Sequence, residues 1–241
     1  MKITKLTIKV LSFICAFIII FSASLKAQEA QSSGSRPFSF GIKAGYSAPV
    51  LAFENQPATT ARLAPVIGGF AQYRFLPWVA ASLEVVYTQY GGNNISPLLI
   101  YSPDSPILTN LGKTDLSIHT VEIPLTAKIG LPGLAGNIKP FLSVGGSVAF
   151  FLQANANNYF TVDNGSGFPF LYNANNIVTS RINGYDFSCL SGTGVDFQGD
   201  KLNFSIEIFY RIGLTNLNVN NKAYAPDFSA NAFGVKIGIG L

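Results

Sequence analysis

The sequence predicts an all-β fold: an eight-stranded antiparallel up-and-down β-barrel that crosses a membrane. Three observations predict it. Apolar residues alternate with small or polar residues in eight segments, and long connections between these segments alternate with short ones. No apolar run after residue 27 reaches the about 18 residues that a membrane helix needs. A chain that is 12% charged and 48% apolar must also bury its apolar side chains in a large core or in lipid.

The first 27 residues predict a cleaved secretory signal peptide. Three lysines within the first nine residues precede an apolar run at 10–23, and Ala27 offers a cleavage position although Leu25 before it is rather large. A transmembrane anchor is the alternative, but the run is short for one. We expect a flexible lead-in at 28–37 and the barrel domain at 38–241.

Removal of this segment changes the charge of the chain. It contains four of the sixteen basic residues and none of the twelve acidic ones, so twelve of each remain. The pI near 9.0 therefore reflects the export signal and gives no reason to expect a nucleic acid partner. One cysteine, Cys189, and one histidine, His119, remain, which predicts no disulfide framework, no metal site and no cofactor.

The eight predicted strands share a two-residue period. They lie at about 38–47, 66–75, 79–90, 115–130, 138–152, 184–197, 202–212 and 231–241. In the last strand, aliphatic or aromatic residues occupy every second position from Phe233 to Leu241, and three glycines and Lys236 lie between them. Successive side chains of a strand point to opposite faces, so one face is apolar and the other nearly bare.

The connections differ in length in a regular way. Long, Asn-, Ser-, Pro- and Gly-rich segments follow every odd-numbered strand, at 48–65, 91–114, 153–183 and 213–230. The connections at 76–78, 131–137 and 198–201 are short. Long extracellular loops opposite short periplasmic turns are typical of outer-membrane barrels, so we expect irregular, exposed loops at one end.

The inner face is predicted to hold charges of both signs. In an eight-stranded barrel the interior is just wide enough for side chains to fill, which favours glycine at many inward positions. Isolated buried charges are costly, so we expect an ion-pair network across the lumen. Its predicted members are Lys43, Arg74, Glu84, Glu122, Lys128, Glu207, Arg211 and Lys236. A polar plug that fixes strand register is the main interpretation, and a gated pore or proton path is the alternative.

Aromatic residues lie near the predicted strand ends. Phe75 and Trp78 flank the first short turn, and four tyrosines, Tyr46, Tyr87, Tyr90 and Tyr210, lie toward the ends of strands. Rings with a polar edge favour the membrane–water boundary, so these residues are expected to form girdles around the barrel.

Several strand motifs resemble the PorT-type outer-membrane β-barrel domain family. They are FGIKAGYS (40–47), VEIPLTAKIG (121–130), KPFLSVGGSVAFFL (139–152), IEIFYRIGLTNL (206–217) and FGVKIGIGL (233–241). The resemblance implies an eight-stranded barrel in the outer membrane of a bacterium, and the family's namesake is linked to protein secretion. One departure is the last residue, Leu241, where such barrels usually end in an aromatic residue that the insertion machinery reads.

One candidate catalytic set is present. Asp115, Ser117 and His119 share a parity on the fourth strand, on the predicted lipid side near the outer rim. A carboxylate, a hydroxyl and an imidazole can together form a nucleophile, and some small outer-membrane barrels hydrolyse lipid acyl chains in this way. Same-face neighbours on a strand are about 6–7 Å apart, however, which is too far for direct hydrogen bonds.

We therefore expect a non-enzymatic barrel in the bacterial outer membrane that acts through its extracellular loops, in binding or in support of an envelope or secretion assembly. Expected partners are the lipid bilayer with its lipopolysaccharide, the barrel-insertion machinery and a protein or surface partner of the loops. Two alternatives remain: the lipid-modifying hydrolase, and a soluble periplasmic ligand-binding barrel whose aliphatic residues point inward.

Overall fold

The computed structural model describes residues 37–54, 58–95, 111–131, 138–162, 170–199, 201–219 and 227–241. The predicted signal peptide at 1–27, and the predicted lead-in apart from Pro37, lie outside these residues. In the part of the chain that is described, no helix is long and apolar enough to cross a membrane.

The described residues form nine strands. These are β1 Phe38–Phe53, β2 Ala64–Leu76, β3 Val79–Ile95, β4 Leu111–Gly130, β5 Ile138–Val162, β6 Phe170–Ile177, β7 Tyr185–Gln198, β8 Asn203–Gly213 and β9 Phe228–Gly240. A short 3-10 helix, η3 (Thr179–Arg181), lies between β6 and β7. Each of the eight predicted strands is present apart from shifts at its ends.

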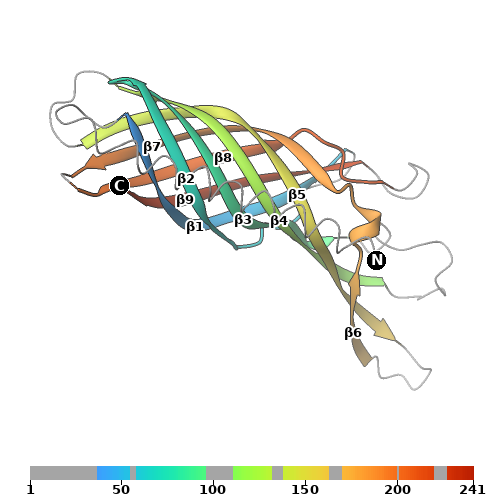
Figure 1. The fold of residues 1–241 in the computed structure, drawn as a ribbon. Coiled ribbons are helices and arrows are strands. Elements are labelled where there is room, and N and C mark those ends of the chain that lie inside the picture. Colours follow the sequence, from blue (N-terminus) through green and yellow to red (C-terminus); the bar gives the residue numbers. More distant parts are fainter. Residues whose placement is uncertain are drawn as a thin grey trace. The chain divides into compact units, whose positions relative to one another are not determined.

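Eight of these strands close into a ring (Figure 1). Its order is β1, β2, β3, β4, β5, β7, β8 and β9, with β9 paired to β1. All of the neighbouring pairs are antiparallel, and β4 pairs with β5 along most of its length. The predicted eight-stranded up-and-down barrel is confirmed. We call the end where β2 meets β3 and β7 meets β8 the turn end, and the opposite end the loop end.

The two faces of each strand differ as the alternation predicts. On β9, Val235 and Ile237 are exposed on the outer surface, whereas Lys236 between them is 7% exposed. The same outward belt includes exposed Ile42, Ile67, Leu125, Ile129, Leu142, Val144, Ile206, Ile208 and Ile239. The soluble-barrel alternative requires aliphatic residues inside and charges outside, which this burial pattern contradicts.

The predicted irregular connection at 153–183 is largely strand. Pairing between β5 and β7 ends at Phe150 and Tyr185, but β5 continues to Val162 and pairs with β6 (Figure 1). On its other edge the extension of β5 is paired with β4. Because both edges of this extension have neighbours, its backbone groups are satisfied despite the many asparagines. We call β6 and the part of β5 that pairs with it the β5–β6 hairpin.

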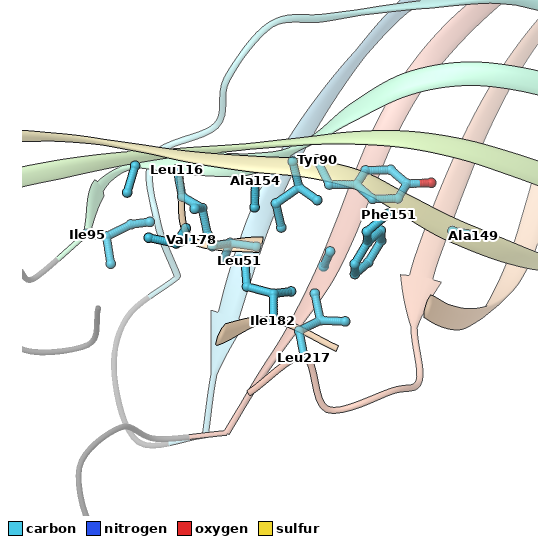
Figure 2. Packing of buried hydrophobic residues seen from close by; sticks show 13 residues of the cluster. Leu51, Tyr90, Ile95, Leu116, Ala149, Phe151, Ala154, Val178, Ile182 and Leu217 are labelled. Atoms are coloured by element: carbon cyan, nitrogen blue, oxygen red, sulfur yellow. The ribbon is translucent and has the colours of Figure 1, made fainter. Parts of the chain in front are cut away.

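The interior toward the loop end is apolar (Figure 2). Thirteen buried residues form this cluster: Leu51, Tyr90, Ile95, Leu116, Ile118, Ala149, Phe151, Ala154, Ala156, Val178, Ile182, Leu217 and Ala230. Segments after β6 and β8 contribute to it and are hydrogen-bonded to each other, as Asn183 N–H donates to Leu217 C=O (2.9 Å). The expected plug is therefore polar over only part of its length.

Candidate functional site

The candidate site is the set of buried charges inside the ring, and its first part joins two lysines to two glutamates. Lys43 of β1 donates a short hydrogen bond to Glu84 of β3 and another, of 3.1 Å, to Glu207 of β8. Lys236 of β9 donates to Glu84 (3.0 Å) and lies 3.6 Å from Glu207. We call these four residues the Lys–Glu cluster. All four are at most 7% exposed.

Strand register and small residues make this cluster possible. Glu207 and Lys236 are direct partners across β8 and β9. Gly238 makes room for the lysine of β1: a Cβ there would lie 2.4 Å from Ser205 Oγ and 3.3 Å from Lys43 Cγ. Glycine at this inward position therefore allows the close approach of a long side chain.

A second group surrounds Arg211 of β8. Its guanidinium donates to Asp186 of β7 (2.6 Å), to Glu122 of β4 (3.0 Å) and to the carbonyl of Ala230 (2.6 Å). It also lies over the ring of Tyr90, 4.2 Å from the centroid. We call Arg211, Glu122, Asp186 and Tyr90 the Arg211 cluster. Arg211 is 1% exposed, so this is a desolvated ion pair.

Further hydrogen bonds saturate the two carboxylates. Glu122 accepts from the Tyr90 hydroxyl (2.5 Å) and from Ser147. Asp186 also accepts from the backbone N–H of Thr215 (3.1 Å), which fixes the segment after β8 at the loop end. Buried charges are tolerated when their hydrogen-bonding capacity is used in this way.

Lys128 and Arg74 lie nearer the turn end. Lys128 Nζ is 3.6 Å from Asp196 and 4.1 Å from the centroid of the Phe141 ring. Arg74 is half-buried and forms no ion pair with any described residue. The structure thus brings seven of the eight predicted network residues into ion pairs and leaves Arg74 apart from them.

Three residues that take part in these interior contacts were not predicted from the sequence as members of the network. Asp186 and Asp196 lie on the strand with polar residues on both faces, where alternation is least clear. Tyr90 was expected in an aromatic girdle, but it is 1% exposed and points inward. Their position along the strand could have identified them, because residues an even number of positions apart lie on the same face. Tyr90 shares its face with Glu84 on β3. Asp186 shares its face with Asp196 on β7.

The candidate catalytic residues do not contact one another. His119 Nδ1 is hydrogen-bonded to the Tyr87 hydroxyl (2.6 Å), and Ser117 Oγ donates to Gln89 Oε1 (3.5 Å). Asp115 Oδ1 accepts from the backbone N–H of Asn94 (3.0 Å). Each side chain is thus bound to β3, and the nucleophile–base–acid chain of hydrogen bonds that the hydrolase alternative requires is not formed.

The arrangement as a whole fills space and pairs charge. Two ionic clusters and an apolar layer follow one another from the turn end to the loop end. Among the described residues, no group of three or more histidine, cysteine, aspartate or glutamate side chains is placed to hold a metal ion.

Comparison with known families agrees with this architecture. A family model described as "Outer membrane protein beta-barrel domain" matches residues 27–219. The chain belongs to this family. Members of the outer membrane protein beta-barrel domain family lie in the bacterial outer membrane, so the apolar belt of this barrel faces the lipid bilayer. The match does not extend to the narrower PorT-type assignment.

Solved outer-membrane proteins are similar at low sequence identity. OprG from Pseudomonas aeruginosa is 14% identical, with a TM-score of 0.48, over 86% of this chain and 96% of that one. Neisserial surface protein A is 12% identical (TM-score 0.45; 87% and 99% covered), and Ail from Yersinia pestis is 11% identical (0.42; 84% and 98%). A search of curated protein sequences found no match.

Proposed function

We propose that this chain is a non-enzymatic outer-membrane barrel with a closed interior, which binds a protein or surface partner at its loop end. The observation that carries the proposal is the filled lumen. Buried side chains occupy successive levels of the interior: Lys43 (1% exposed), Arg211 (1%) and Leu217 (0%). A lumen filled in this way leaves transport no open path, so activity is left to the surfaces at the two ends.

The β5–β6 hairpin supports the loop end as the binding surface. It continues past the level where the ring pairing of β5 and β7 stops, and three of its residues, Asn175, Asn176 and Ile177, are exposed. The strand β6 contains no charged residue and no proline, the devices that usually protect an edge strand from pairing. An extended segment of a partner could add to such an edge through backbone hydrogen bonds.

The first experiment shortens this hairpin without opening the ring. Asn158 and Ala174 are cross-strand partners, so residues 159–173 can be replaced by Asn-Gly, which closes a two-residue hairpin. The change keeps the hydrogen bond from Thr114 to Asn158 (2.8 Å). Affinity capture from envelope extracts should recover a partner with the intact barrel and much less of it with the shortened one, which keeps only the last four residues of the β6 edge.

Two controls are needed to interpret the capture experiment. Both proteins should show the heat-modifiable gel migration of a folded barrel, which separates lost binding from lost folding. In planar bilayers neither should conduct, because the interior is filled. Equal capture by both proteins, or large steady currents through the intact barrel, would contradict the proposal.

The resemblance to the PorT-type family supports a more specific version, in which the captured partner belongs to an envelope or secretion assembly. Lipopolysaccharide in the outer leaflet and the barrel-insertion machinery are the other partners that we propose. The cleaved signal peptide at 1–27 stays a prediction, and N-terminal sequencing of the mature protein tests it: the first residue should be Gln28.

A further inference from the structure

The turn end of the barrel contains two adjoining pockets that the proposed function does not use. Each has a volume of about 30 Å³. They share four lining residues, Gln72, Arg74, Lys128 and Asp196. The second pocket is also lined by Lys139 and by Trp78.

The charges of these pockets are unbalanced. Three cations, Arg74, Lys128 and Lys139, line them together with one carboxylate, Asp196. Lys128 is 5% exposed, yet its ammonium donates no hydrogen bond to any described residue, and Asp196 lies 3.6 Å away. An ammonium has three donors, and because Lys128 lines both pockets these donors are open to a ligand there.

The other interior cations use their hydrogen-bond donors differently. Lys43, Lys236 and Arg211 each donate hydrogen bonds of at most 3.1 Å to carboxylates. In the Lys–Glu cluster two cations face two anions. Among the described residues that line them, the turn-end pockets therefore carry more positive than negative charge.

We propose that these pockets form a site for the carboxylate of a peptide on the periplasmic side of the membrane. Short turns of outer-membrane barrels face the periplasm, so the pockets open there. A cavity needs about 10–15 Å³ per water, so each pocket holds about two waters, the room that the two oxygens of a carboxylate occupy. The planar guanidinium of Arg74 can bind both oxygens, and Lys128 supplies a second charge.

A carboxylate fits better than a phosphate. Asp196 lies within both pockets and repels a doubly charged ligand more strongly than a singly charged one. The carboxylate can come from the C-terminus of a periplasmic protein or from a stem peptide of peptidoglycan, and both present the same group to Arg74 and Lys128.

The experiment uses the intact barrel in detergent and its single tryptophan, Trp78, which lines the second pocket. N-acetyl-Ala-Ala with a free carboxylate, its C-terminal amide and a soluble peptidoglycan stem peptide are each titrated. Tryptophan fluorescence and calorimetry report binding. The free acids should bind saturably and the amide at least about tenfold more weakly, because it lacks the charge-assisted bonds. The tighter of the two acids identifies the source.

Matched variants locate the site. Arg74→Gln and Lys128→Met should each weaken binding of the acids by about tenfold or more, whereas Lys201→Gln should change it less than about twofold. Lys201 is exposed, lies near the same end and lines neither pocket. Equal binding of acid and amide, equal weakening by Lys201→Gln, or no binding up to about 10 mM would overturn the proposal. Loss of partner capture at the β5–β6 hairpin would leave it intact, because the two surfaces are at opposite ends.

Discussion

Replacement of Arg211 by methionine removes the cation that two buried carboxylates share. Arg211 lies 2.6 Å from Asp186 Oδ2 and 3.0 Å from Glu122 Oε1, and Asp186 is fully buried. Methionine keeps most of the apolar stem but leaves both carboxylates without a counter-charge. Removal of one partner of a buried ion pair costs about 3–5 kcal/mol, so we expect the free energy of unfolding to fall by this amount. The ratio of folded to unfolded barrel would fall by a factor of about 10² to 4 × 10³.

The assay is denaturant unfolding of the barrel in lipid vesicles, with the folded fraction read from heat-modifiable migration and extrapolated to zero denaturant. The control for the loss of one charge is Lys201→Met. Lys201 is exposed, so its replacement should change the free energy of unfolding by less than about 0.5 kcal/mol. The triple variant Arg211→Met, Glu122→Gln and Asp186→Asn removes all three charges together. It should recover most of the loss, because a buried ionic group can be replaced by neutral residues at little cost.

The result that would refute this reasoning is a loss below about 1 kcal/mol for Arg211→Met, the range of solvent-exposed ion pairs. It would mean that water reaches the carboxylates and that the lumen is not sealed at this level. The non-conducting barrel of the proposed function would then lose its main support.

Three further outcomes test other parts of the structure. A lipid-soluble paramagnetic relaxation agent should collide with a spin label at Val235 but not with one at Lys236. The reverse accessibilities would contradict the assignment of the two faces. Gly68→Ala should strongly reduce the folding yield, because its Cβ would lie 2.1 Å from the carbonyl oxygen of Val85 in β3. The control Gly69→Ala should fold normally, because the nearest contact of its Cβ is 3.5 Å away. Equal folding yields would show that the interior is more loosely packed than described. His119→Ala should leave the lipid A of the producing cells unchanged by mass spectrometry, and a changed acyl pattern would revive the hydrolase alternative.

Alternation along β1, β3 and β9 was enough to predict which side of the barrel their charges occupy. Lys43, Glu84 and Lys236 are buried where their parity places them, and Val235 and Ile237 are exposed. This works because the period of a strand is two residues whatever it pairs with. The same rule would have placed Tyr90 inside, had its aromatic character not suggested a girdle.

The β5–β6 hairpin could not be predicted in this way. Asparagine is depleted in strands, so the asparagines of 155–158 and 173–176 indicated a loop. A bulge also changes the parity of β5: His119 faces Gln153 while Thr120 faces Phe151, so Leu152 is an extra residue. Phe151 and Ala154 therefore both point inward, although they differ in parity. The extension is held by its neighbours on β4 and β6, which is tertiary information.

Which charges meet inside the barrel depends on geometry that no single strand contains. Lys43 and Glu84 both point inward by parity, but their strands are separated by β2, and Lys43 and Glu207 are separated by β9. Whether such residues lie at the same height is set by the stagger accumulated around the closed ring. If the stagger of the ring changed by one step, Arg211 would lie beside other residues and Asp186 would lose its partner. The two ionic clusters therefore stabilise one closed register over its neighbours. The triple neutral variant at Arg211 should keep most of its stability but allow more than one register. Cross-linking between paired cysteines placed on β7 and β8 would detect this loss of uniqueness.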